Sequence, residues 1–532
     1  MTKKARQTTA AGLTRRDLLK TSGLALGGLA LGGTLVGARA PPARAAERCG
    51  RNGCGYPNGM PTRQYTYPTQ LDPFTPNTPL DPDELRITFL GSGFPPARRA
   101  QQMMSIFAEV GPWIPDPNGG PGHATDAFVF DCGAGVLTNY TAMGISLGRM
   151  DKVFISHLHA DHMSDLSAIY GFGPAYDRKS PLYVWGHGPS GVKSPRPPRR
   201  LYDDGTKAFC TNLREAMRWH SESMSFLPTS YAGYPIPTRE GWGLPCDPVP
   251  VADDPPDDAY ALVPIELDWT KSGQVPGDNV AYHNRTTGVK VTHFPVIHCR
   301  QGSVGYKLEW TNPAVPGAPP LTMIYTSDTR PETMSIAQAK NMDPQTGVAR
   351  GVDVFIHEMI LPPELMAMKN IGLPAPDYSD PRFAGAVYIA KTVEESSHTP
   401  QGAYGYLLSQ IRPRPKLAVI AHFPVADDTV ACALQSVQAH FPDASYPVLG
   451  RDIIWATDFM VLSVKAGQIT QRMGQVGDYT FGVPENLPGN QETPKYHTAQ
   501  GLMDPTAQLD LTTLIPPYNK ETKTWNYCEN GY

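Results

Sequence analysis

The 532-residue sequence has no Cys-x-x-Cys pair, no internal repeat and no large excess of charge of one sign. The lack of cysteine pairs disfavours a thiolate zinc site. The formal net charge of −4 argues against a polyanionic partner, so we expect no nucleic-acid partner. Apart from residues 21–37, no apolar run is long enough to cross a bilayer, and we expect no stable membrane insertion once that segment is removed.

The first 45 residues are interpreted as a cleaved targeting segment. Arg15 and Arg16 precede a Gly/Leu/Ala-rich stretch at residues 21–37, and small-x-small sites follow at residues 38–40 and 43–45. This arrangement resembles a twin-arginine export signal. The resemblance implies a folded passenger, the twin-arginine translocase as a partner during export, and a periplasmic location. The alternative is a membrane anchor, but the stretch is short and rich in glycine.

The eight cysteines are scattered along the chain. An oxidising compartment would permit disulfides. Cys49 and Cys54 flank a Gly/Asn loop and could pair with each other, or one of them could pair with Cys528.

Beyond the signal, the sequence predicts an irregular arm at residues 46–82 and a main domain at residues 83–465. Short apolar runs there alternate with helical patterns, and each run ends in a polar residue. This alternation predicts a layered α/β fold. Residues 175–285 are dense in proline and aromatics, and we interpret them as an insertion. Residues 466–532 are expected to form a C-terminal extension.

One short stretch carries most of the chemistry: His-Leu-His-Ala-Asp-His at residues 157–162, directly after the apolar run 153–155. His157 and His159 are two residues apart, so an extended backbone points both side chains the same way. Asp161 and His162 follow where the chain bends. One loop can therefore offer ligands to two adjacent metal ions, and imidazole with carboxylate suits zinc. The alternative is a solvated histidine-rich loop.

Further ligands must come from distant segments, since one loop cannot complete two sites. His298, Asp328 and His422 each end an apolar strand pattern. Each alone could be an ordinary polar strand end. Together they place ligand-type side chains at one sheet edge.

With these motifs in order, residues 86–458 resemble the metallo-β-lactamase superfamily. The resemblance implies an αββα sandwich with two metal ions at one edge. It implies that His157, His159 and His298 bind one zinc ion, that Asp161, His162 and His422 bind the other, and that Asp328 bridges them. Asp131, at the end of another strand, would steady the histidine loop. Manganese or iron could replace zinc.

The branch of the superfamily is indicated by other residues. True β-lactamases of this fold lack the bridging aspartate, and di-iron relatives usually carry glutamate at position 159. His357-Glu358 and His398 resemble two elements of ribonuclease Z and of its arylsulfatase-like and phosphodiesterase relatives. The resemblance implies that His398 protonates the leaving group and that Glu358 orients His398. Asp161 is expected to be both a metal ligand and a catalytic residue. Met359 and the His-Thr-Pro sequence at 398–400 depart from the ribonuclease Z pattern and favour the exported arylsulfatase-like members.

These observations predict an exported binuclear zinc hydrolase of sulfate or phosphate esters, with a metal-bridging hydroxide as the nucleophile. The expected substrate is a small-molecule ester, and the oligomeric state is left open. A zinc lactonase or carboxylic-ester hydrolase is the alternative, and an exported scaffold with a vestigial site is a third reading. Aromatic residues of the insertion would either line the substrate site or pack the insertion itself: Trp185, Tyr202, Trp219, Tyr231, Tyr234 and Trp242.

Overall fold

The computed structural model describes residues 71–96, 98–115, 122–225, 259–441, 443, 446–476, 518–519 and 524–525. The export signal, most of the arm, Cys49, Cys54 and Cys528 lie outside these residues, as do Tyr231, Tyr234 and Trp242 of the expected insertion. Among the described residues, no helix is both long and apolar enough to cross a membrane.

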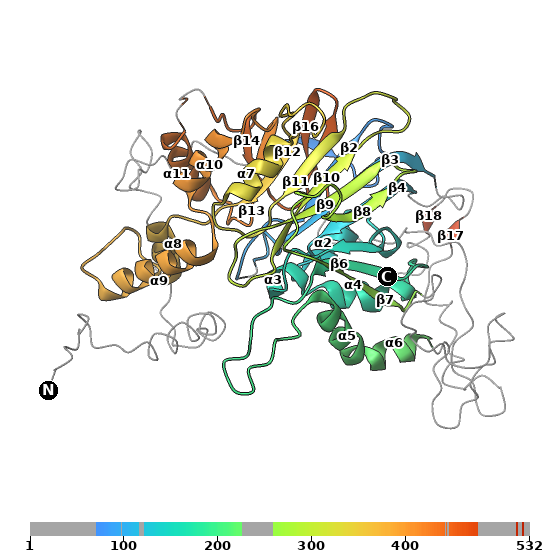
Figure 1. Ribbon diagram of the computed structural model, residues 1–532, viewed down its shortest axis with the longest axis horizontal. Coiled ribbons are helices and arrows are strands. Elements are labelled where there is room, and N and C mark those ends of the chain that lie inside the picture. The colour runs from blue at the N-terminus through green and yellow to red at the C-terminus, as the bar shows by residue number, and fades with distance from the viewer. Residues whose placement is uncertain are drawn as a thin grey trace. The chain divides into compact units, whose positions relative to one another are not determined.

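The first sheet has nine strands, in which β2, β3 and β4 form an antiparallel meander and β4 to β7 run parallel (Figure 1). Aromatic and β-branched residues dominate its buried strands, as expected for a pleated surface packed on both faces. In spatial order the strands are β1 (Asp72–Phe74), β16 (Gln468–Gly474), β15 (Met460–Lys465), β2 (Leu85–Gly91), β3 (Ser105–Ile114), β4 (His123–Phe130), β5 (Lys152–Phe154), β6 (Leu182–His187) and β7 (Leu262–Leu267).

The second sheet has seven strands. Its strands β8 to β11 are antiparallel neighbours, and β11 to β14 run parallel. In spatial order they are β14 (Ile453–Trp455), β13 (Leu417–Ala421), β12 (Val354–Glu358), β11 (Leu321–Tyr325), β10 (Val304–Trp310), β9 (Val289–Pro295) and β8 (Val280–Asn284). Two further short strands, β17 (Tyr518–Asn519) and β18 (Thr524–Trp525), pair with each other.

The two sheets face each other across one apolar core. Alternate residues show this packing: Ile87 and Phe89 of β2 join the core between the sheets, whereas Leu90 faces the helices on the other side. In β12, likewise, Ile356 points between the sheets and Phe355 points outward. This period of two is the expected consequence of strand geometry.

Helices cover the outer face of each sheet. Against the first sheet lie α2 (Val136–Ala142), α4 (Leu166–Phe172) and α5 (Thr206–Ala216), and against the second lie α7 (Thr333–Lys340), α8 (Pro363–Ile371), α10 (Gln401–Gln410) and α11 (Asp427–Ala439). The remaining helical segments are α3 (Ala160–Met163), α6 (Arg218–Ser225), α9 (Pro381–Ser397), η3 (Leu147–Arg149) and η4 (Gly173–Ala175). The predicted αββα sandwich is confirmed.

Two boundaries differ from the sequence-based expectation. Residues 175–285 are not one insertion, because β6, β7 and β8 are integral strands of the two sheets. The first sheet also takes in β1 from the expected arm and β16 from the expected extension. Proline-rich connections had hidden the strand pattern in these segments.

Candidate metal centre

The loop that follows β5 brings its four ligand-type residues to one end of the first sheet. Ile155, Ser156 and His157 continue from the buried strand, and α3 begins at Ala160, one residue after His159. Buried His162 on α3 is thereby turned back toward His157, with ring centroids 4.1 Å apart. The loop therefore contributes ligand-type side chains to two neighbouring groups.

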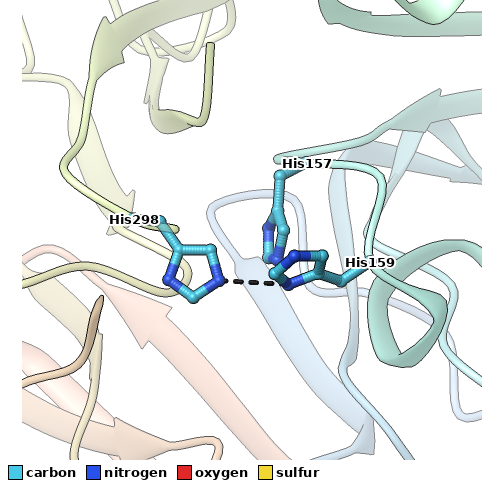
Figure 2. Close-up of side chains that lie close together, drawn as sticks. All are labelled: His157, His159 and His298. Carbon is cyan, nitrogen blue, oxygen red and sulfur yellow. Dashed lines mark hydrogen bonds between the residues drawn. The ribbon is translucent and has the colours of Figure 1, made fainter. Parts of the chain in front are cut away.

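The first group is three imidazoles, His157, His159 and His298 (Figure 2). His298 follows β9 on the facing sheet, and its Nε2 atom lies 3.1 Å from Nδ1 of His159. The ring centroids of the three residues are separated by 4.5 to 4.8 Å. The predicted three-histidine set is thus brought together by the structure.

The second group contains Asp161, His162, Asp328 and His422. The Nε2 atom of His422 lies 3.1 Å from Asp161 Oδ2 and 3.4 Å from Asp328 Oδ2. Asp328 Oδ1 is also 3.4 Å from His162 Nε2. The Oδ2 atom of Asp328 lies 3.7 Å from His298 Nε2, so this carboxylate stands between the two groups, as expected of a bridge.

These residues fit a pair of divalent cations. Zn–N distances of about 2.0–2.1 Å in a tetrahedron require ligand atoms about 3.4 Å apart, close to the separations above. His157 Nε2, His162 Nε2 and Asp328 Oδ1 are buried and make no hydrogen bond within the described part of the chain. Such buried polar atoms are costly unless they have a partner, and a metal ion supplies one.

The protonation states of the site residues also favour a bound cation. Burial lowers the pKa of His298 to about 4, so this ring is in the neutral form that binds metal. Burial also lowers the pKa of His162, but the nearby carboxylates of Asp328, Asp161 and Asp131 outweigh it and raise that pKa well above its usual value. The excess of negative charge around His162 is what a bound cation would neutralise.

Asp131 fixes the orientation of the loop, in the place the resemblance implied. Its Oδ1 atom accepts the backbone N–H of Ser156 at 2.7 Å, and its Oδ2 atom lies 2.8 Å from His162 Nδ1. The hydroxyls of Ser156 and Tyr325 also donate to Oδ2, each at 2.7 Å. With Nδ1 of His162 held this way, its Nε2 is left to face the site.

Backbone strain is concentrated here. Asp131, Ser327 and His422 have φ values of 55°, 56° and 53°, in the left-handed region that residues with a side chain rarely occupy. Each lies directly after, or within two residues of, a strand end. Strain of this kind persists where surrounding structure enforces it, and it commonly marks functional sites.

An imidazole–carboxylate pair lies beside the second group. Helix α9 ends at Ser397, so that His398 follows it with its Nδ1 atom 2.9 Å from Glu358 Oε1 at the end of β12. Thr329 donates its backbone N–H to the same Oε1 at 3.0 Å. Burial lowers the pKa of His398, but the Glu358 carboxylate outweighs it and raises that pKa to about 9.

Two parts of this arrangement were not foreseen. Tyr325, Ser156 and Ser327 form a buried hydroxyl network around Asp131, with Ser327 Oγ donating to Ser156 Oγ at 2.7 Å. Hydroxyl residues within and next to apolar strands carry no sequence signal for such a role. Trp185, expected to line a substrate site or to pack the insertion, instead stacks on Phe154 between the sheets, with ring centroids 4.6 Å apart.

Comparison with known proteins places this geometry in context. No family model matches the chain. A ribonuclease Z of Treponema denticola is 38% identical over 61 residues, which are 12% of this chain and 20% of that protein. The chain thus matches about a fifth of the length of this relative. The predicted resemblance to ribonuclease Z is confirmed as sequence similarity over that segment.

Two solved structures align with about seven-tenths of the chain. The metallo-β-lactamase fold protein YhfI of Bacillus subtilis covers 72% of this chain and 100% of its own, with 11% identity and a TM-score of 0.39. The short form of human tRNase Z covers 71% of this chain and 99% of its own, with 17% identity and a TM-score of 0.38.

Proposed function

We propose that this chain is a binuclear metal-dependent hydrolase of sulfate or phosphate esters, with zinc as the metal. The observation that carries the proposal is the His398–Glu358 pair, in which Nδ1 of His398 lies 2.9 Å from Oε1 of Glu358. This pair lies beside the two groups of ligand-type side chains. The similarity to ribonuclease Z supports a phosphoester-cleaving ancestry. A manganese or iron pair would suit the same mixed nitrogen and oxygen donors.

In this proposal, the three histidines would hold the first metal, Asp161, His162 and His422 would hold the second, and Asp328 would serve both. When bound, the metal ions supply Lewis acidity and a nucleophile derived from water at neutral pH. Asp131 holds His162 in the tautomer that leaves Nε2 free, and Ser397 does the same for His298 by accepting from its Nδ1 at 2.9 Å.

His398 is proposed as the general acid. Its Nδ1 is engaged by Glu358, which leaves the other ring nitrogen to deliver a proton to the departing oxygen. A protonated His398 is favoured at neutral pH because the adjacent carboxylate is buried with it. Expulsion of an alkoxide from a sulfate or phosphate ester needs this help more than opening of a lactone does, and this favours the ester over the lactonase alternative.

The test is a substrate panel with metal content measured on the same sample. Purified protein is assayed on an aryl sulfate, an alkyl and an aryl phosphodiester, and a lactone. Turnover of the sulfate or phosphate esters by protein loaded with metal supports the proposal. Turnover of the lactone alone would replace it with the lactonase alternative, and no turnover of any ester by fully loaded protein would contradict it.

We also propose that the protein is exported to the periplasm by the twin-arginine route. The support is the Arg15-Arg16 pair and the apolar stretch after it. A metal centre assembled from segments more than 260 residues apart, such as Asp161 and His422, suits a route that carries folded proteins.

A further inference from the structure

A cavity of about 610 Å³ lies in the second sheet, at the end of β9 that is opposite the metal centre. Small-molecule sites in proteins usually have volumes of about 300–1,000 Å³, so a ligand of ordinary size fits here. This distal cavity is bordered by β8, β9 and β10 and by the loops next to them. Its polar lining consists of His283, Arg285, Lys290, Glu309, Thr311 and Arg350.

The distal cavity is a separate site, because the length of β9 lies between it and the metal centre. Gly288 lines the cavity and immediately precedes β9, whereas His298 follows the other end of the same strand. The 7 residues of this strand span roughly 23 Å at about 3.3 Å per residue. A small ligand in the cavity therefore does not reach the metal ligands.

The wall of the distal cavity carries more positive than negative charge. Three permanent cations line it, Arg285, Lys290 and Arg350. Glu309 is the one carboxylate among the described residues that line it. The Glu309 oxygens lie 3.9 Å from Lys290 Nζ and 3.7 Å from Lys307 Nζ, so two ammonium groups share this carboxylate. The excess of positive charge attracts an anion into the cavity.

The two arginines suit an anion with several oxygen atoms. Arg285 is exposed in the turn between β8 and β9, and its guanidinium has no ion-pair partner within the described part of the chain. Arg350 pairs with Asp343 through Nη2, which leaves its other N–H groups to a ligand. A guanidinium binds phosphate through two parallel hydrogen bonds. A phosphate monoester, with a charge near −2 at neutral pH, matches three cations better than a single carboxylate does.

The turn that carries Arg285 is held in place before any ligand binds. Asn284 Oδ1 accepts the backbone N–H of Thr286 at 3.0 Å, and the backbone N–H of Thr311 donates to Gly288 O at 3.0 Å. Gly288 has a φ of 79°, and a Cβ atom at this position would collide with Thr311 O. A cation on a fixed turn loses less conformational entropy on binding than a cation on a flexible segment.

Part of the cavity wall is apolar. Pro313 and Pro320, from the loop between β10 and β11, line the cavity together with the cations. Small-molecule sites typically combine such apolar surface with a few polar groups that fix the orientation of the ligand. The proline rings offer contact to an organic group and nothing to a bare ion, so we expect a ligand with an organic part.

We propose that the distal cavity binds a small organic phosphate monoester. Its phosphate group would contact Arg285, Lys290 and Arg350, and its organic part would lie against the two prolines. The site goes beyond the proposed hydrolysis and does not depend on it, because none of the ligand-type residues of the metal centre lines the cavity.

The test uses phenylphosphonate, whose carbon–phosphorus bond prevents ester hydrolysis at the metal centre. Equilibrium dialysis measures its binding to the metal-loaded full chain. The cavity variant, Arg285→Gln with Lys290→Gln, removes two cations of the cavity. The matched control, Lys179→Gln with Arg199→Gln, removes two exposed cations that do not line it. Asp328→Asn disturbs the metal centre alone and identifies any phenylphosphonate bound there.

The cavity variant is expected to lose one equivalent of bound phenylphosphonate, with affinity at that site lowered about tenfold or more, because two charged hydrogen-bond donors are removed. The control variant should bind like the wild type, and Asp328→Asn should keep the equivalent that the cavity variant loses. Equal binding by the cavity variant and the wild type would overturn the proposal. Loss of the same equivalent in Asp328→Asn would also overturn it, by assigning the binding to the metal centre.

Two further probes test the chemical class of the ligand. Inorganic phosphate has the anionic group without the organic part, and benzoate has the aromatic ring with a carboxylate in place of the phosphonate. Weaker binding of both at the site that depends on Arg285 and Lys290 supports an organic phosphate. Inorganic phosphate that binds as tightly as phenylphosphonate would overturn the role of the prolines, and tighter binding of benzoate would overturn the choice of phosphate.

Discussion

The Nδ1 atom of His398 lies 2.9 Å from Oε1 of Glu358, although 40 residues separate the two in sequence. Helix α9 and strand β12 both end at this point, and the same Nδ1 atom lies 4.0 Å from Asp328 Oδ2. A buried carboxylate beside an imidazole stabilises the protonated form of the ring.

If His398 is the general acid, His398→Ala should keep both metals and reduce the rate by about 10²–10⁴-fold, the usual size of such a contribution. The reduction should be smaller for a nitrophenyl ester than for an alkyl ester of the same acid, because nitrophenolate departs without a proton. Rates on both esters and the metal content are measured on one preparation. An equal reduction on both, or a loss of metal, would point to a structural or ligand role instead.

Glu358→Gln should move the alkaline limb of the pH–rate profile to lower pH. The carboxylate stabilises the charged form of His398 and so raises its pKa. Without that negative charge, the pKa of His398 falls, and the protonated form needed for catalysis is lost at lower pH. The profile of kcat/KM is recorded for the wild type and the variant. A variant with reduced rate but an unmoved alkaline limb would contradict this electrostatic role.

Changing Arg15 and Arg16 together to Lys should leave the precursor in the cytoplasm, because the paired arginines are the feature read by the twin-arginine route. Fractionation of cells that express the full chain, followed by immunoblotting, measures this. Normal export of the double variant would mean that the signal was misread.

The convergence of the ligand-type residues could be expected from sequence because they lie at or just after the ends of buried strands, and strand ends of such a sandwich meet at one edge. His298 and Asp328 belong to the facing sheet, yet their position after apolar runs was enough. The hydroxyls of Tyr325 and Ser327 could not be predicted, because a tyrosine in an apolar strand is equally compatible with core packing. The Tyr325 hydroxyl lies 2.7 Å from Asp131 Oδ2 only because the two sheets pack face to face.

The strands of residues 175–285 escaped prediction for a related reason. β6 and β7 are neighbours in the first sheet, but the connection between them is long and rich in proline, which obscures the pattern on either side. Strand β8 is short and only partly buried. Local periodicity is weak in such strands, and their sheet partners supply the specificity.

Protein purified without chelator should contain near two metal equivalents, since the two groups of ligand atoms are both complete. Asp328→Asn should lower the metal occupancy of both sites. The Asp328 carboxylate oxygens lie 3.4 Å from Nε2 of His162 and 3.7 Å from Nε2 of His298, so the change affects both groups. Elemental analysis after zinc loading measures both. One equivalent in the loaded wild type would contradict the binuclear centre.

Tyr325→Phe should weaken metal binding at the second group by about 10–100-fold, the usual effect of removing a group that orients a metal ligand. The Tyr325 hydroxyl donates to Asp131 Oδ2, the same oxygen that holds His162 Nδ1. Without it, Asp131 and the His162 ring are less firmly oriented. Tyr404→Phe is the matched control, since the Tyr404 hydroxyl is also buried but makes no hydrogen bond in the described part of the structure. Competition with a metal chelator measures affinity in each variant, independently of turnover. Equal affinity in Tyr325→Phe and the wild type would show that Asp131 orients His162 without help from the tyrosine.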